Sequence, residues 1–348
     1  ERIPSGCRLL HASGMRLATT EPGGETREQL RCEAIRRIRL LSMQSYFVLE
    51  RDRQQNSHPD GTSVYDQHCK RRISMSQDYE NPKAAHLLSE IKDIAKRAGS
   101  IMLSASVDDK SVMSKDGHAN FVTLYDEKVQ AFLIAALSDV LPEAHFVGEE
   151  DGQEVFLPEF ETGYTFVIDP IDGTSNFMKA YRPGVTSIAL LQNGKPYLGV
   201  IYQPYSEQMF YAQKGAGAFE NGKPLLPVET PLKDCLVGMG TSPYYGEEIS
   251  RSALEIGLWY LNRSIDIRRT GSACYDLCMV ASGRTGLFYE PRLCLWDYAA
   301  GCCIVEEAGG KVTDMYGNPL TYRGKTSLCA AASGVSKEDY LPPRQMVK

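Results

Sequence analysis

The chain has 348 residues, of which 43% are hydrophobic and 24% charged, so it can bury one large domain or two modest ones. The formal net charge of −6 gives no support for binding to nucleic acid or to an anionic membrane surface. No uninterrupted apolar run reaches the roughly 18 residues of a membrane span, and none is predicted.

The cysteines indicate an intracellular protein. Ten Cys residues in 348 are too few for a secreted domain held together by disulfides. Their spacing lacks the paired C-x-x-C pattern of a zinc site, since Cys274 precedes Cys278 by four residues and Cys302 adjoins Cys303. We therefore expect reduced thiols packed as small apolar groups in a cytoplasmic protein.

Residues 1–75 differ from the rest, with twelve Arg and one Lys against nine acidic residues. They could be an organellar targeting region, a disordered extension, or residues encoded upstream of a natural start at Met75. A transit peptide should be poor in acidic residues, which these are not. We predict that residues 1–75 form an N-terminal extension outside the main fold.

Residues 76–228 read as an α+β lobe. Asn81 and Pro82 form a helix start signal, and apolar residues at helical spacing follow to Met102; a second helix is predicted over 126–141. Five strand-like runs follow at 145–150, 165–170, 186–192, 197–203 and 208–213. Asn-Gly pairs at 193–194 and 221–222 are typical of hairpin turns. Consecutive strands joined by tight turns predict an antiparallel sheet.

Residues 229–348 alternate helical and strand patterns, which favours a second, α/β lobe. We expect strands at 235–240, 286–290 and 327–333 and helices near 246–261, 272–283 and 296–309.

Acidic residues follow several of these strands. Asp169 and Asp172 lie three residues apart in "FVIDPIDGTSNF", Glu149 and Glu150 end the preceding strand, and Asp297 begins a helix. Like charges so close repel unless a cation holds them or one is neutral. Carboxylates at neighbouring strand ends suit Mg²⁺ or Mn²⁺, which would turn the repulsion into shared coordination.

Residues 173–175, Gly-Thr-Ser, form a turn that can open a helix, where backbone N–H groups attract an anion such as phosphate. Acidic metal ligands beside an anion site suggest phosphoryl transfer with two metal ions. Each piece also has an ordinary explanation: "DPIDG" is a common turn, "GEED" suits a solvated loop, and Asp297 could cap its helix.

Three segments together resemble the inositol monophosphatase family, within the wider group of Mg²⁺-dependent, lithium-sensitive sugar phosphatases. "VGEE" is similar to the family's G-E-E segment, and "DPIDGTSNF" to its D-P-I-D-G-T-x-N-F signature. "LWDYAAGCCIVEEAGG" is similar to its W-D-x-A-A-G and E-A-G-G segments. The resemblance runs from about residue 83 to 335. It implies a layered αβαβα fold, an active site between two lobes, and a homodimer.

The resemblance also implies roles for the acidic residues. Glu149, Asp169 and the carbonyl of Ile171 would hold one metal ion, and Asp169, Asp172 and Asp297 a second. A third ion is implied near Glu149, with Lys115 and Asp126 nearby. Asn120 and Tyr125 depart from the family pattern there and weaken the third site.

The attacking water would be oriented by Glu149 and the Thr174 hydroxyl. The phosphate and sugar would be bound by residues at two turns and two strand ends: Gly173, Thr174, Ser175, Thr241, Gly271, Ser272, Ala273 and Glu290. Of these, Glu290 would accept hydrogen bonds from ring hydroxyls.

The leading hypothesis is a Mg²⁺-dependent phosphomonoesterase acting on inositol monophosphate or a similar small polyol phosphate. Fructose-1,6-bisphosphatase activity and phosphatase action on 3′-phosphoadenosine 5′-phosphate are alternatives within the same group. Glu290 favours a neutral polyhydroxyl ring, because a carboxylate would repel a second phosphate, whereas Arg292 could reverse that argument. A non-catalytic binding protein would be expected to have lost metal ligands, and none is lost here.

Overall fold

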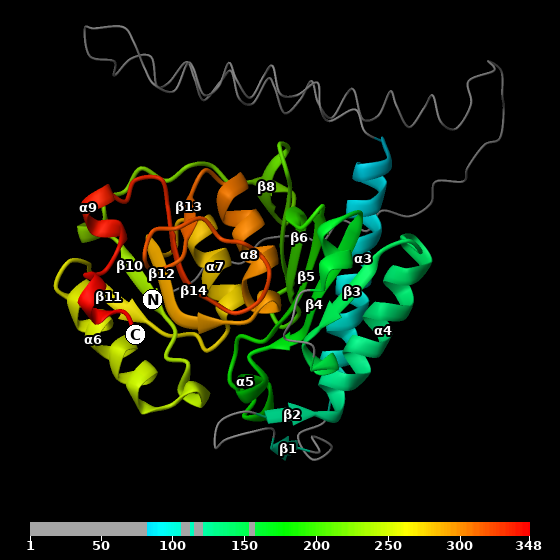
Figure 1. The fold of residues 1–348 in the computed structure, drawn as a ribbon. Coiled ribbons are helices and arrows are strands. Elements are labelled where there is room, and N and C mark those ends of the chain that lie inside the picture. The colour runs from blue at the N-terminus through cyan, green and yellow to red at the C-terminus, as the bar shows by residue number, and fades with distance from the viewer. Residues whose placement is uncertain (1–81, 106–111, 115–120, 153–156) are drawn as a thin grey trace, which may run out of the picture. The chain divides into compact units, whose positions relative to one another are not determined.

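The computed structural model describes residues 82–105, 112–114, 121–152 and 157–348. These residues form five alternating layers (Figure 1). Two helices cover one face of a large sheet, two helices cover its other face, and a smaller sheet and an outer helix complete the stack. The expected αβαβα fold is therefore confirmed. The predicted extension, residues 1–75, lies outside the described residues, and the lobe boundaries at 76–228 and 229–348 stay predictions.

The first layer is helices α3 (Pro82–Leu103) and α4 (Leu124–Val140). α4 begins with a capping box. The Thr123 side chain accepts a hydrogen bond from the backbone N–H of Asp126, and the Asp126 side chain accepts one from the backbone N–H of Thr123. Apolar side chains at helical spacing, such as Ile91 and Leu133, pack against Phe166 of the large sheet. Fully burying a side chain of this size stabilises the fold by roughly 1.5–3 kcal/mol.

The second layer is a seven-stranded sheet of order β3-β4-β5-β6-β7-β8-β9. Asn193-Gly194 and Asn221-Gly222 have positive φ, as the two central residues of a hairpin turn require. The predicted antiparallel pairing is confirmed from β4 to β9. The strands are β3 (His145–Gly148), β4 (Tyr164–Asp172), β5 (Val185–Gln192), β6 (Lys195–Gln203), β7 (Gln208–Gln213), β8 (Gly217–Glu220) and β9 (Lys223–Pro224).

The antiparallel prediction is wrong for β3, which pairs parallel with β4 and places Gly148 opposite Ile168. The connection between these two strands is longer than a tight turn. It includes 3₁₀ turns and returns the chain to the edge of the sheet at which β3 begins. Both strands therefore end at the same edge, and Glu149 follows directly from one while Asp169 lies near the end of the other.

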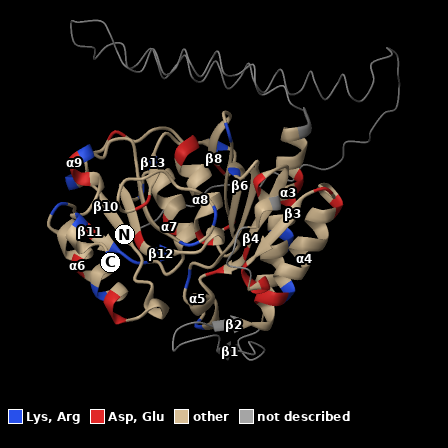
Figure 2. Ribbon diagram, viewed as in Figure 1, with Lys and Arg blue, Asp and Glu red and all other residues tan. Residues whose placement is uncertain are grey.

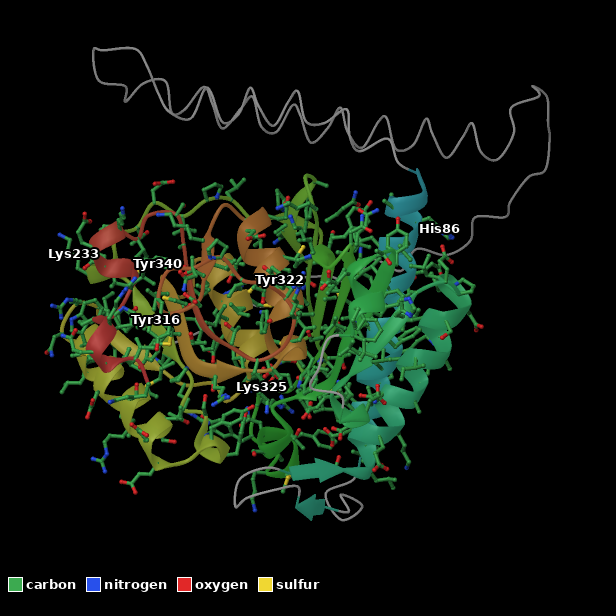
Figure 3. The ribbon with its side chains drawn as sticks, viewed as in Figure 1. His86, Lys233, Tyr316, Tyr322, Lys325 and Tyr340 are labelled. Atoms are coloured by element: carbon green, nitrogen blue, oxygen red, sulfur yellow. The ribbon has the colours of Figure 1, made fainter. Side chains whose placement is uncertain are left out.

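The middle layer is α7 (Ala273–Ala281) and α8 (Leu295–Glu307), both almost entirely buried between the sheets. Gly301 allows this close packing, because a Cβ there would lie 2.5 Å from Cδ1 of Leu277. Tyr322, labelled in Figure 3, packs its ring against Tyr298 of α8 in a tilted arrangement, with ring centroids 5.7 Å apart.

The fourth layer is a five-stranded sheet of order β11-β10-β12-β14-β13, in which β10 is parallel to β11 and β12, and β14 is antiparallel to β12 and β13. α6 (Glu247–Leu261) covers its outer face. The predicted helices and strands of this part of the chain are present within a few residues of their expected ends. The strands are β10 (Leu236–Met239), β11 (Asp266–Arg268), β12 (Leu287–Leu293), β13 (Lys311–Thr313) and β14 (Thr326–Ala331).

Several short elements complete the fold. Among the described residues, no helix has the length and apolar character needed to cross a bilayer. The short elements are β1 (Val112–Ser114), β2 (Phe121–Thr123), α5 (Thr174–Met178), α9 (Lys337–Tyr340) and the 3₁₀ turns η3 (Glu149–Asp151), η4 (Pro158–Glu161), η5 (Leu232–Asp234), η6 (Pro243–Tyr245) and η7 (Arg344–Met346).

Candidate metal and phosphate site

Four carboxylates from three separate segments interact at the end of β4. Acidic ribbon segments gather near the labels β4, α4 and α5 (Figure 2). Glu149 lies beside Asp169 because their strands are parallel, and the two side chains hydrogen-bond. Asp172 and Asp297 also lie close enough to raise the pKa of Asp169. The expected convergence of these acidic residues is therefore present in the fold.

An irregularity in β4 brings Asp169 and Asp172 to the same end of the strand. The pairing with β5 shifts register between these two residues, so the strand does not simply alternate faces there. Asp172 then reaches across to α7, where Oδ2 accepts from the Ser272 hydroxyl and from the backbone N–H of Cys274, both at 2.7 Å. Two donors hold one oxygen of Asp172 in a fixed direction.

Asp297 is the third residue of α8 rather than its N-cap, which is Cys294. Its Oδ2 accepts from the Cys294 backbone N–H at 2.6 Å in a capping box. Asp297 can therefore have both roles. One carboxylate oxygen caps the helix, and the side chain still faces the other carboxylates.

Burial and mutual repulsion disfavour the charged forms of these side chains. Burial, with Glu149, Asp172 and Asp297 nearby, raises the pKa of Asp169 well above its usual range. Burial, with Asp172 and Glu149, raises the pKa of Asp297 in the same way. Burial also raises the pKa of Asp172, although the hydrogen bonds from Ser272 and Cys274 oppose the rise. A cation placed among these groups would reverse the shifts.

The donor set fits a hard divalent cation, and one oxygen is open for it. Asp169 Oδ1 is buried and has no hydrogen-bond partner, an arrangement that costs about 1–3 kcal/mol unless something else binds the oxygen. Within the described residues, no three His, Cys, Asp or Glu side chains form an already assembled metal site. The fit therefore rests on the oxygen chemistry, the open Asp169 oxygen and the concentrated negative charge.

Thr174, at the start of α5, lies between β4 and α4. Its hydroxyl is 3.2 Å from Asp126 Oδ1 and 3.2 Å from the carbonyl oxygen of Ile171. Asp126 is fully buried, and its Oδ2 accepts from the Thr123 backbone N–H at 2.7 Å. The structure thus joins three of the predicted residues, Asp126, Ile171 and Thr174. Lys115 lies outside the described residues.

The two predicted binding turns adjoin each other. Gly173 has φ of +91°, and a Cβ there would lie 3.3 Å from the carbonyl oxygen of Gly271. Asn176 joins the turns, because its Nδ2 donates to the carbonyls of Pro183 at 2.7 Å and Thr270 at 2.8 Å. Ser175 is exposed on the first turn, and Ser272 and Ala273 begin α7 on the second.

Glu290 lies in β12, close to this group. A Cβ at Gly240 would lie 2.0 Å from Glu290 Cδ, so only glycine allows the carboxylate to lie there. Ser242 donates to Glu290 Oε1 through its backbone N–H at 3.2 Å and its hydroxyl at 3.0 Å. Burial nevertheless raises the pKa of Glu290 to about 7. The Thr241 hydroxyl accepts from Arg269 Nε at 3.1 Å, and Arg269 in turn lies close enough to Glu290 to oppose the rise in its pKa.

Sequence reasoning missed four residues that contact or lie near this group. Asn176 comes directly after the turn at 173–175, and an Asn side chain there can donate hydrogen bonds to backbone carbonyls. The sequence therefore contained a signal for its role. The sequence contains no such signal for Ser242 or Cys274, because their contacts are far away along the chain. Ser242 contacts Glu290, about 50 positions away, and Cys274 contacts Asp172, about 100 positions away. Nor does the sequence contain one for Tyr244. Tyr244 is 43% exposed, and it lies close enough to Asp297 and Glu290 for their charges to act on its phenol.

The fold is the layered fold expected from the sequence, and the comparisons with known proteins identify its class. The family model described as "Inositol monophosphatase family" matches residues 84–347. Inositol-1-monophosphatase of Bacillus subtilis is 31% identical over 265 residues, covering 74% of this chain and 98% of the relative. Human inositol monophosphatase 1 is 31% identical over 261 residues, covering 72% of this chain and 93% of the relative.

A solved structure agrees with this. The extragenic suppressor protein suhB of Bartonella henselae is 32% identical, with a TM-score of 0.61, covering 70% of this chain and 92% of that one. The chain belongs to the inositol monophosphatase family and is a phosphatase of that family.

Proposed function

We propose that the protein is a Mg²⁺-dependent phosphomonoesterase that hydrolyses inositol monophosphate or a similar small polyol phosphate. The observation that carries the proposal is the buried, unpartnered Asp169 oxygen among three further carboxylates, beside the Thr174 hydroxyl. The names of the Bacillus subtilis and human relatives support the substrate class, since both are called inositol monophosphatases.

In this proposal Glu149, Asp169 and the Ile171 carbonyl would hold one Mg²⁺, and Asp169, Asp172 and Asp297 would hold a second. Mn²⁺ would suit the same oxygens. Bound Mg²⁺ would lower the pKa of a coordinated water and stabilise charge on the leaving oxygen. A weaker third ion near Glu149, Asp126 and Lys115 is part of the same prediction.

The chain's own residues orient the nucleophile. Asp126, held by the Thr123 backbone N–H, can take the Thr174 hydroxyl proton in a hydrogen bond. The lone pairs of Thr174 Oγ1 can then accept a hydrogen bond from a water molecule. The second proton of that water would be accepted by the Glu149 carboxylate. Backbone N–H groups of Gly173 and Thr174, with Ser175, would bind the phosphate oxygens.

The polyol would lie on the side of the five-stranded sheet. Glu290, fixed by Ser242 and Gly240, can accept hydrogen bonds from ring hydroxyls. The α7 turn, Gly271, Ser272 and Ala273, would contact the remaining hydroxyls. Thr241 would contribute through its hydroxyl, which Arg269 fixes.

The decisive experiment measures phosphate release from sugar, inositol and nucleotide monoesters, with Mg²⁺ and with EDTA. We expect Mg²⁺-dependent release with the highest kcat/KM for inositol monophosphates or a related polyol phosphate. Absence of release from every ester would favour the alternative of a non-catalytic binding protein of the same fold.

A second candidate substrate class carries another anionic group, as fructose 1,6-bisphosphate and 3′-phosphoadenosine 5′-phosphate do. The observation that favours it is a pair of cations at Tyr245. Arg292 Cζ is 5.2 Å and Lys325 Nζ 5.1 Å from the ring centroid, and Figure 3 labels Lys325. The Tyr245 hydroxyl is 3.5 Å from Cys294 Sγ, next to the Asp297 cap. Higher kcat/KM for a bisphosphate would reverse the ranking.

The remaining expectations belong to the same proposal. We propose a cytoplasmic homodimer that is sensitive to lithium, with a small phosphate ester as its binding partner and neither nucleic acid nor membrane as a ligand. Size-exclusion chromatography with light scattering tests the dimer. Inhibition by Li⁺ that depends on the Mg²⁺ concentration tests the metal assignment.

A further inference from the structure

Gln130 connects α4 to the turn that carries Glu149. It lies one helical turn after Asp126, so both side chains extend from the same face of α4. The Gln130 side chain is only 5% exposed. It packs directly on Gly148, where a Cβ would lie 2.5 Å from Gln130 Oε1, so a larger residue at position 148 would displace this amide.

The Gln130 amide uses both its acceptor and its donor. Its Oε1 accepts from the Glu150 backbone N–H at 3.0 Å, and its Nε2 donates to Asp151 Oδ1 at 2.9 Å. The other oxygen of Asp151 accepts from the Gly148 backbone N–H at 3.2 Å. These three hydrogen bonds form a closed network around η3, on both sides of Glu149.

We propose that Gln130 is a positioning residue for the Mg²⁺ site, whose amide fixes the 148–151 turn so that the Glu149 carboxylate faces Asp169. The inference rests on the proposed function, in which Glu149 is a metal ligand. One face of α4 then fixes two parts of the site, since Asp126 binds Thr174 and Gln130 holds the turn of Glu149. Residues that hold metal ligands in place typically change metal affinity by about 10–100-fold when altered.

An amide is needed here, because a carboxylate at position 130 could still accept from Glu150 N–H but could not donate to Asp151. Gln130→Glu would instead set two carboxylates against each other and open the turn. The double variant Gln130→Glu with Asp151→Asn restores the network in reverse. The amide introduced at position 151 would donate to the carboxylate introduced at position 130 and accept from Gly148 N–H. The net charge of the double variant would equal that of the unaltered protein.

The test measures the Mg²⁺ concentration that gives half of the maximal rise in melting temperature, and separately half-maximal phosphate release. We expect Gln130→Glu to raise both concentrations about 10-fold or more, with substrate KM at saturating Mg²⁺ changed less than about 2-fold. The double variant should recover most of the loss. Gln203→Glu is the matched control, because Gln203, at the end of β6, is also 5% exposed and accepts from the Ser206 backbone N–H at 2.9 Å.

The outcomes distinguish a failure of the proposed function from a failure of the inference about Gln130. If the unaltered protein shows neither Mg²⁺-induced stabilisation nor Mg²⁺-dependent phosphate release, the proposed function fails, and this inference with it. A normal Mg²⁺ response that Gln130→Glu leaves unchanged overturns the inference alone, as does a double variant that recovers nothing. Should Gln130→Glu not fold, the double variant decides, with a near-normal Mg²⁺ response supporting the inference and a weakened one overturning it.

Discussion

The Thr174 hydroxyl donates to Asp126 Oδ1 at 3.2 Å, linking the end of β4 to the first turn of α4. The two residues are 48 positions apart, and Asp126 is fully buried with a backbone N–H already on its other oxygen. The Ile171 carbonyl oxygen is an equally near acceptor at 3.2 Å, and a metal ion bound to that carbonyl would leave Asp126 as the acceptor of the hydroxyl proton. The lone pairs of Thr174 are therefore directed away from Asp126.

This contact predicts different results for two substitutions at position 174. Thr174→Val keeps the shape but removes the hydroxyl, so kcat should fall by about 10²–10³-fold with KM little changed. Thr174→Ser keeps the hydroxyl and should retain activity within about 10-fold. Steady-state kinetics at saturating Mg²⁺ measures both. Equal losses in the two variants would show that the methyl group, rather than the hydroxyl, matters.

Asp169→Asn should abolish turnover, because the proposed bridging ligand would lose its charge. We expect a fall in kcat of roughly 10³-fold or more, equivalent to about 4 kcal/mol of barrier. The fold should persist, since the substitution changes neither the size of the side chain nor its packing. Phosphate release with Mg²⁺ provides the measurement, and turnover comparable to that of the unaltered protein would exclude the bridging role.

Metal-free stability gives the same variant a second readout. The raised pKa of Asp169 means that its contribution to stability is complete at low pH and is lost as pH rises through the folded-state value. An amide at this position has no charge to bury. In EDTA above neutral pH, Asp169→Asn should therefore melt at the same or a higher temperature than the unaltered protein. Asp234→Asn, on the distant turn η5, is the control.

Part of the candidate site can be predicted from the sequence because several of its residues are close together along the chain. Asp169, Asp172 and Thr174 follow one strand within six residues, and the resemblance adds Glu149 and Asp297 by their spacing. Strand direction was harder to predict, as the parallel pairing of β3 with β4 shows. A short apolar run carries no information about its direction in a sheet.

The supporting contacts were not predictable, because each depends on the tertiary structure. Ser242 holds Glu290 from 48 residues away, and Cys274 holds Asp172 from 102 away. Neither residue type has a pattern that would mark such a role. Their positions follow from the pairing of β10 with β12 and from the packing of α7 between the two sheets, which only the assembled layers provide.

Deleting residues 1–75 should leave catalysis intact. The family match begins at residue 84, and the site residues begin at Asp126 among those described. We expect kcat and KM for the preferred ester within about 2-fold of the full chain, since no predicted ligand is removed. Parallel assays of the two proteins at equal Mg²⁺ provide the comparison. A tenfold loss would place part of the active site in the extension.

Glu290 should make the metal-free protein less stable as pH rises towards neutrality. Its pKa is about 7 in the folded state against an ordinary value of 4.5, so the folded state keeps a proton that the unfolded state has lost. The contribution of Glu290 to stability is therefore complete below about pH 4.5 and is lost as pH rises through about 7. A shift of this size corresponds to roughly 3 kcal/mol.

Glu290→Gln removes this titration and should flatten the fall in unfolding free energy between pH 5 and pH 8. Urea unfolding in EDTA at the two pH values measures the difference. Glu255→Gln, an exposed change on α6, should keep the full slope. A slope that Glu290→Gln leaves unaltered would mean that Glu290 is already ionised at pH 5, held so by Ser242 and Arg269, and would favour a permanently charged acceptor for substrate hydroxyls.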